Sequence, residues 1–395
     1  MSTASLRSFR HLVPELRLFN GPDSLGMLGK ELERAGSSRA VILCGSSLAR
    51  EGMAEQIRSA TGGRCAGVFT GIKAHSPLPA VEAAAAELDR LKADCVIALG
   101  GGSAIVTARA ASILLAEKGD ARTLCTTRDE GGALRSPKLL APKLPQFVIP
   151  TTPTTATLKA GSAVLDPVDG KRLALFDPKT RAQAVFIHPE MLATPPRDLI
   201  VSAGLNTLAM ALEGLMSRSG DPFSDALLMH AARLLRQGLQ QAGRSDAGDD
   251  PAIRADLMFA SLLCGHGTDY TGAGIAIPLG HAISARFHID NGLANAIVLP
   301  HVVRFNEEAA GAGLLKLVDA FGLNADRRAP AAVVVDAMQS IFDALGIPKR
   351  LRDIGVTRES LPQLAAISME DWFVRDNPRR VRDAGELEQV LESAW

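Results

Sequence analysis

Apolar runs of strand length alternate with stretches of helical character in the first half of the chain. Residues 40–44, 96–99 and 147–150 are short, almost continuously apolar runs, and each leads into glycine, serine or threonine. The stretch 79–92 has apolar residues every three or four positions, which is the period of an amphipathic helix. This alternation predicts an α/β fold, a doubly wound parallel sheet whose ligand-binding loops follow the carboxyl ends of the strands.

The pattern changes after about residue 190. Strand-like runs disappear, and long Ala/Leu-rich amphipathic stretches extend from residue 196 to the C-terminus, interrupted by a polar loop at 243–251. Before this change, residues 125–146 are rich in charge, glycine and proline and predict a long loop. We therefore expect two domains, an α/β nucleotide-binding domain at 1–192 and an all-α domain at 193–395.

Composition narrows the class of protein. Lys+Arg and Asp+Glu balance at 43 each, so no excess charge predicts binding to nucleic acid or to an acidic membrane. Residues 1–17 lack the apolar core of a signal peptide, and no uninterrupted apolar stretch reaches membrane-spanning length. The 5 cysteines are scattered and show no C-x-x-C pair, which is typical of a reducing compartment. These features predict a soluble cytoplasmic protein.

The second apolar run leads into Gly100, Gly101, Gly102 and Ser103, and an Ala-rich stretch of helical character follows. Backbone without side chains can approach a phosphate closely, and the free N–H groups and dipole at a helix start favour an anion. Ser103 is suited to cap the helix or to donate to a phosphate oxygen. The spacing matches neither G-x-G-x-x-G nor a P-loop. The glycines predict a phosphate-binding loop, and the alternative is a tight turn without a ligand.

Two further loops follow predicted strands. Thr151, Thr152 and Thr155 come after the third apolar run and offer hydroxyl donors to a phosphate or a ribose, although threonine is also common in β-rich segments without a ligand. Gly45 and Ser46 come after the first apolar run. Because ligands bind where parallel strands end, these residues join the glycine loop as candidate cofactor-binding residues.

These loops belong to a set of motifs that recurs, in this order, in a known family. The motifs are Gly100–Ser103, Ile149–Thr152, Leu299–Val302 and Arg304–Asn306. Together they resemble the iron-containing (group III) alcohol dehydrogenases, relatives of dehydroquinate synthase, over roughly residues 15–390. The resemblance implies an N-terminal nucleotide-binding domain, a helical C-terminal domain and a cleft between them. It also implies NAD(P) across the glycine and threonine loops, a divalent metal at the cleft floor, and a homodimer.

The metal-ligand positions depart from the family pattern. The resemblance places the ligands, typically an Asp and three His, at Asn206, Met210, Ile277 and Asn291. Fe²⁺ and Zn²⁺ require imidazole, carboxylate or thiolate to offset their dehydration, and amide, thioether and alkyl groups do not replace these ligands. We therefore expect no metal at this position. Asn206 also resembles the maleylacetate reductase branch, which has Asn there but retains the following His.

A relocated metal site is the alternative. Candidate ligands gather in the sequence at His266, Asp269, His281, His288 and Asp290. His266 and Asp269 are three residues apart and would share one face of a helix. The neighbouring glycines instead favour a turn, in which such residues serve as caps.

Substitutions around the glycine loop bear on the cofactor. The resemblance implies an Asp and a Lys at the positions that Val106 and Arg109 occupy in this chain. It also implies, in many members, an Asp that binds the adenosine ribose at the position of Gly45. Without that carboxylate a 2′-phosphate is not repelled, so NADP is favoured over NAD, although a small residue also suits a tight turn.

Catalysis without a metal requires another group at the substrate oxygen. The resemblance places His281 near the nicotinamide, where an imidazole would protonate the developing alkoxide; the alternative is a packed helix histidine bonded to a carbonyl. Asn206 and Asn291 would donate N–H groups to the same oxygen. Lys159, after the threonine loop, is either an anchor for a substrate anion or a solvated lysine.

Three functions remain open from the sequence. The leading one is a metal-independent, NAD(P)-dependent oxidoreductase acting on a small alcohol, aldehyde or oxo acid. The alternatives are a lyase or hydrolase that uses the same cleft, and a non-catalytic binding homologue. The intact glycine and threonine loops favour the first function. The missing metal ligands, and Val106 in place of an Asp, favour the other two. The fold alone does not decide among them, because function resides in the site.

Overall fold

A computed structural model of the chain describes residues 8–129, 134–168, 170–244, 250–323 and 329–395. Its contacts divide the chain into two compact units. The α/β unit comprises Leu16–Thr207 and Gln237–Gly265, and the helical unit comprises Met1–Glu15, Leu208–Arg236 and His266–Trp395. The expected boundary between residues 192 and 193 lies inside α7 (Pro189–Ala193), whereas the contacts change from one unit to the other within three long helices.

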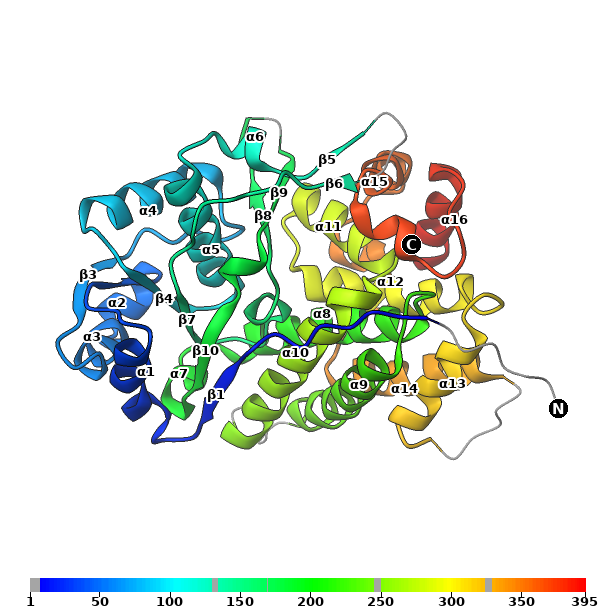
Figure 1. Cartoon of the computed structure of the whole chain (residues 1–395). Helices are drawn as coiled ribbons and strands as arrows, with labels where there is room; N and C mark the ends of the chain where they lie inside the picture. Colours follow the sequence, from blue (N-terminus) through cyan, green and yellow to red (C-terminus); the bar gives the residue numbers. More distant parts are fainter. Residues whose placement is uncertain (1–7, 130–133, 169, 245–249, 324–328) are drawn as a thin grey trace. The chain divides into compact units, whose positions relative to one another are not determined.

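Six parallel strands form the sheet of the α/β unit, in the order β1-β10-β7-β4-β2-β3 (Figure 1). Their bounds are β1 Arg17–Asn20, β2 Ala40–Leu43, β3 Cys65–Phe69, β4 Cys95–Gly100, β7 Gln146–Pro150 and β10 Ala182–Ile187. The three predicted apolar runs form β2, β4 and β7, which are adjacent in the sheet. The predicted parallel α/β fold is confirmed.

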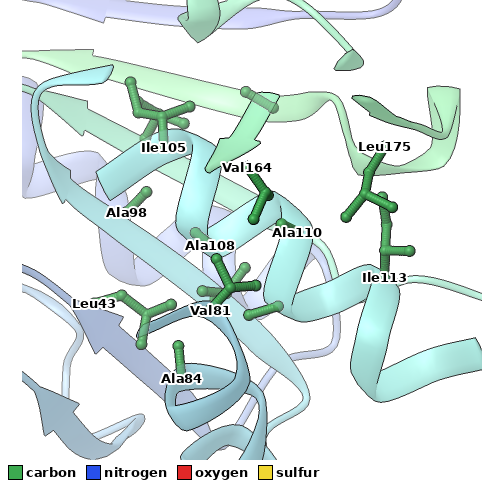
Figure 2. Close-up of a cluster of buried hydrophobic side chains, with 14 of the residues drawn as sticks. Leu43, Val81, Ala84, Ala98, Ile105, Ala108, Ala110, Ile113, Val164 and Leu175 are labelled. Carbon is green, nitrogen blue, oxygen red and sulfur yellow. The ribbon is translucent and has the colours of Figure 1, made fainter. Parts of the chain in front are cut away.

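One face of the sheet is covered by two helices. Leu43 of β2 and Ala98 of β4 lie in a buried cluster with side chains of α4 (Leu78–Arg90) and α5 (Gly102–Glu117), which Figure 2 shows. Helix α4 corresponds to the amphipathic stretch predicted at 79–92. Burial of this cluster supplies the hydrophobic free energy that holds the helices on the sheet.

The other face is covered by a second pair of helices. Ile42 of β2 and Ile97 of β4 pack in a cluster with α1 (Leu28–Arg34) and α3 (Met53–Ala60). Successive side chains of a strand point to opposite faces, so a sheet covered on both faces requires apolar residues at every position. This explains why the strands are continuous apolar runs.

Two small antiparallel hairpins and several short helices also belong to the α/β unit. The hairpins are β5 (Thr127–Arg128) with β6 (Leu134–Arg135), and β8 (Gly161–Leu165) with β9 (Arg172–Phe176). The first hairpin lies in the segment predicted as a loop, and its strands have only 2 residues each. The short helices are η1 Ser24–Met27, α2 Ser46–Arg50, α6 Ala121–Leu124, η2 Thr155–Thr157 and η3 Pro178–Thr180.

Helices are the regular elements in the rest of the described chain, as predicted from residue 196 onward. The long ones are α8 Arg197–Met216, α9 Pro222–Ala242, α10 Pro251–Thr271, α11 Ala276–Phe287, α12 Asn291–Phe305, α13 Gly311–Ala320, α14 Pro330–Ala344 and α16 Ala384–Ala394. The short ones are η4 Leu351–Ile354, η5 Arg358–Ser360, α15 Leu361–Ser368 and η6 Trp372–Asp376. Helices α8, α9 and α10 contribute residues to both units. Most of the polar loop predicted at 243–251 lies outside the described residues.

The turn predicted around residues 265–269 is wrong, because α10 continues through them. Its glycines mark close packing. A Cβ at Gly265 would lie 2.5 Å from the carbonyl oxygen of Thr155, and one at Gly267 would lie 2.7 Å from Cγ of Leu228. Such contacts leave no room for a side chain, so glycine is retained in the helix despite its low helix propensity.

Helix α8 is long and apolar enough to cross a membrane, judged by its length and hydropathy alone. In the structure, 78% of the most apolar 18-residue stretch of this helix is buried, which is typical of a core helix. No other helix in the described parts of the chain meets the same criteria.

Candidate functional site

The glycine loop joins β4 to α5. Gly100 ends β4 with a φ of +140°, a conformation that L side chains rarely adopt, so the turn requires glycine. Gly101 is the N-cap residue of α5, and no side chain caps the helix. The 16-residue helix α5 therefore presents uncapped N–H groups where β4 ends, which is a favourable environment for an anion.

The threonine loop packs directly on the glycine loop. A Cβ at Gly101 would lie 2.6 Å from Oγ1 of Thr152, and one at Gly102 would lie 3.0 Å from Oγ1 of Thr154. The N–H of Thr151 donates to the carbonyl oxygen of Gly100 at 3.1 Å. The two predicted loops thus meet at one edge of the sheet, and threonine hydroxyls lie beside the start of α5.

Ser103 does not cap α5, and that prediction is wrong because the cap position is Gly101. The Ser103 hydroxyl accepts the N–H of His75 at 3.1 Å, and its carbonyl oxygen accepts the hydroxyl of Ser76 at 3.1 Å. His75 and Ser76 have φ values of 62° and 48°. Non-glycine residues with positive φ are uncommon, so this contact holds an unusual turn against the first turn of α5.

Gly45 and Ser46 lie at the same edge of the sheet as the glycine loop. Gly45 is the N-cap residue of α2, directly after β2. Because β2 pairs with β4 in parallel, the two strands end side by side. Gly45 also forms a β-bridge with Gly71. The structure therefore gathers the loops after β2, β4 and β7, which is the arrangement of a nucleotide site in an open parallel sheet.

Arg109 fixes the threonine loop from inside the protein. Its guanidinium is completely buried, with Nη1 donating to the carbonyl of Gly161 at 2.6 Å and Nη2 to that of Ala156 at 2.7 Å. Ala156 lies in η2, which begins with Thr155. Lys159 follows this turn, and its backbone N–H donates to the carbonyl of Ala156 at 3.3 Å. Arg109, which stands where the family resemblance implies a lysine, thus helps to support the threonine loop.

In the helical unit, His281 on α11 is paired with a carboxylate. Its Nδ1 lies 3.1 Å from Oδ2 of Asp371. Oδ1 of Asp371 accepts the N–H of Phe373 at 3.0 Å and caps η6. The His281 side chain remains 24% exposed, so the ring is accessible. His281, the predicted acid, therefore has a carboxylate partner. The alternative prediction is a packed helix histidine bonded to a carbonyl group.

His301, from a motif that carries the family resemblance, suits acid catalysis less well. Burial and the positive charges of Arg304 and Arg350 lower the pKa of His301 to about 4. A histidine with this pKa is neutral at physiological pH and holds no proton to donate readily. Of these two histidines, His281 is the better acid candidate.

Glu213 fixes the start of α11. It is fully buried, and its Oε1 accepts the N–H of Ala276, the first residue of that helix, at 2.6 Å. Its Oε2 is buried without a hydrogen-bond partner. Burial raises the pKa of Glu213 to about 7, with a further contribution from the negative charge of Asp371, and the backbone N–H groups of α11 oppose this rise. Nothing in the local sequence marks Glu213 as part of this site.

The raised pKa predicts a pH-dependent stability. A carboxyl that titrates near pH 4.5 when unfolded and near 7 when folded favours the folded state at low pH, so its contribution falls as pH rises from about 4.5 to 7. The full difference corresponds to roughly 3 kcal/mol. Glu213→Gln, which resembles the neutral acid, is expected to gain stability relative to the parent as pH rises through this window. Urea unfolding at a series of pH values measures this.

Glu386 provides a control of opposite sign in the same unit. Hydrogen bonds from Arg382 and from Arg379 lower the pKa of Glu386 to about 2. Its stabilising effect is therefore present above about pH 4.5 and is lost as pH falls toward 2. Glu386→Gln is expected to be less stable than the parent at neutral pH. Identical pH profiles for the two variants would contradict the assignment of Glu213.

The residues at the expected metal-ligand positions occupy both units. Asn206 lies in the α/β unit, whereas Met210, Ile277 and Asn291 lie in the helical unit. Met210 and Ile277 are buried, and Oδ1 of Asn291 is buried without a hydrogen-bond partner. Joint action of Asn206 and Asn291 on one substrate oxygen remains a prediction, because they belong to different units.

These donors do not fit the iron that the family resemblance implies. An alkyl group cannot coordinate, and amide and thioether groups are weak ligands for Fe²⁺ or Zn²⁺. Across the described residues, no group of three or more His, Cys, Asp or Glu side chains is arranged to hold a metal ion. No such group lies at the histidines and aspartates between residues 266 and 290, all of which the structure describes.

Two family models match the chain almost end to end. Residues 14–189 match the model described as iron-containing alcohol dehydrogenase, and residues 200–395 match the C-terminal model of the Fe-containing alcohol dehydrogenase family. The matched segments agree with the α/β first half and the helical second half.

Individual relatives cover the same range. The chain is 27% identical to lactaldehyde reductase of Escherichia coli (strain K12), over 95% of this chain and 97% of the relative. It is 26% identical to maleylacetate reductase of Burkholderia cepacia, over 96% of this chain and 95% of the relative. Among solved structures, sulfoacetaldehyde reductase of Bifidobacterium kashiwanohense in complex with NAD⁺ aligns with a TM-score of 0.84 and 21% identity, over 98% of this chain and 99% of that chain.

Proposed function

Because the chain belongs to the iron-containing alcohol dehydrogenase family, we propose that it is an NAD(P)-dependent oxidoreductase that acts on a small alcohol, aldehyde or oxo acid without a bound metal. The observation that carries the proposal is the contact between the glycine and threonine loops at the uncapped start of α5. As part of the proposal, we expect a cytoplasmic homodimer, with a small-molecule substrate as the main binding partner.

The nucleotide would be held by the loops after β2, β4 and β7. The N–H groups at the start of α5 and the hydroxyls of Thr151 and Thr152 suit a pyrophosphate. Gly45 leaves space for a ribose, with or without a 2′-phosphate, so both NAD and NADP remain candidates. When bound, the reduced nicotinamide supplies a hydride to the carbonyl carbon of the substrate.

Metal independence is supported by the chemistry of the four inherited positions, which lack imidazole, carboxylate and thiolate. The substrate oxygen then requires a proton donor and hydrogen bonds from the protein. We assign the proton donor to His281, hydrogen bonds to Asn206 and Asn291, and recognition of a substrate anion to Lys159. The pairing of His281 with Asp371 supports its role, since a carboxylate stabilises the imidazolium.

A fluorescence titration of protein dialysed against EDTA tests the cofactor proposal. Enhanced or blue-shifted nicotinamide emission is expected with micromolar NADPH or NADH, and the comparison of the two decides which cofactor binds more tightly. Turnover of a panel of small aldehydes and oxo acids should persist after dialysis, with metal content measured on the same sample. A folded sample that binds neither nucleotide would contradict the redox proposal.

A further inference from the structure

We propose that Asp371 is a positioning residue, which holds the His281 ring in the tautomer with hydrogen on Nδ1 and leaves Nε2 to exchange a proton with the substrate. The catalytic meaning of this inference depends on the proposed function. The tautomer itself is a property of the folded chain and can be measured without any cofactor.

Asp371 is held at both of its oxygens. Oδ2 lies 3.1 Å from Nδ1 of His281, and Oδ1 accepts the N–H of Phe373 at 3.0 Å. Its side chain is 14% exposed. A carboxylate accepts hydrogen bonds but donates none, so the ring nitrogen that faces it must carry the hydrogen. The Asp371–His281 contact therefore selects one of the two neutral tautomers.

The helix that carries His281 is fixed at two other points. Glu213 accepts the first N–H of α11. The Ser368 hydroxyl of α15 donates to the carbonyl of Leu364 at 2.8 Å and also lies 3.3 Å from the carbonyl oxygen of Pro278 in α11. These contacts place the backbone of α11 independently of Asp371. What Asp371 adds is control of the orientation and protonation of one side chain, which the backbone contacts do not provide.

The proton balance of the step follows from this tautomer. In the reducing direction, protonated His281 gives the proton on Nε2 to the substrate oxygen as the carbonyl carbon is reduced. The ring is left neutral, with hydrogen on Nδ1 facing Asp371. It regains a proton at Nε2 from solvent, which reaches a side chain that is 24% exposed. In the oxidising direction, neutral Nε2 accepts the alcohol proton.

Nuclear magnetic resonance on protein with ¹⁵N-labelled histidine tests the tautomer. The chain has 8 histidines, and the His281 signals are assigned by their loss in His281→Gln. At a pH where the ring is neutral, the nitrogen shifts and long-range couplings are expected to place the hydrogen on Nδ1. In Asp371→Asn the amide can still cap η6, but its NH₂ group can face the ring, so the hydrogen is expected to move to Nε2. A neutral parent ring with hydrogen on Nε2, or no change in the variant, would overturn the proposal.

Kinetics then test the consequence of the tautomer. Asp371→Asn is expected to lower kcat by about 10²-fold or more, with KM and NADPH affinity changed little. Asp371→Glu, which restores a carboxylate, should recover part of kcat. Ser368→Ala is the matched control, because it removes another contact between α11 and the α15 region without touching His281.

The outcomes separate this inference from the proposed function. If Ser368→Ala and Asp371→Asn reduce kcat equally, Asp371 has only a structural role and the inference fails. If the parent protein turns over no substrate, the proposed function fails, and the resonance experiment still decides which tautomer Asp371 selects.

Discussion

Gly101→Leu is expected to abolish binding of NADH and NADPH while the chain still folds. The Cβ alone would lie 2.6 Å from Oγ1 of Thr152, and the rest of the leucine side chain would need space beside the two loops. Either the side chain fills the phosphate position or the threonine loop moves away from α5. Both outcomes would prevent the close approach of backbone N–H groups to a phosphate on which the proposed binding depends.

Nucleotide fluorescence titration measures the effect, and circular dichroism with thermal unfolding verifies the fold. Gly101→Ala should weaken binding less than leucine, because it adds only the Cβ. Gly26→Ala is the control in the same unit, since nothing lies within 4 Å of a Cβ at that position. Unchanged nucleotide affinity in Gly101→Leu would show that this loop is not the nucleotide site.

The sheet could be predicted from the sequence because its strands are buried on both faces. Ile42 and Leu43 point to opposite sides and are both fully buried, so the strand is a continuous apolar run. The turn predicted at the glycines of α10 is wrong because the reason for these glycines is not local. Gly265 and Gly267 indicate a turn by composition, whereas their actual constraint is a close neighbour far away in the sequence, which no local pattern reveals.

The candidate site also contains residues that a local motif marks and residues that only the packing brings in. The glycine and threonine loops are local features of strand ends, so their residues could be selected without a structure. Asp371 lies 90 residues from His281, and Glu213 lies 63 residues from Ala276. Both carboxylates sit in segments without any motif of their own. Only the packing of the helical unit brings them to α11, where Asp371 faces Nδ1 of the proposed acid and Glu213 accepts the N–H of Ala276.

His281→Ala is expected to lower kcat by about 10²-fold or more, which corresponds to about 3 kcal/mol of transition-state stabilisation. The substitution removes the only proton donor that we assign to the substrate oxygen, and it leaves the glycine and threonine loops of the other unit unchanged. NADPH affinity should therefore equal that of the parent, and the loss should appear in kcat under saturating cofactor. Steady-state kinetics and the fluorescence titration, made on the same preparation, separate the two effects.

His288→Asn is the matched control at the end of the same helix. His288 has a φ of 55°, and asparagine tolerates this left-handed conformation, so α11 should keep its C-terminal cap. This variant should retain kcat within about twofold, because surface substitutions away from a site have small effects. If His281→Ala also retained the parent's kcat, the acid would be another group, and the pairing with Asp371 would be an ordinary contact between α11 and η6. A large loss confined to His281→Ala would instead locate proton transfer on this ring, in a family member whose metal-ligand positions lack imidazole, carboxylate and thiolate.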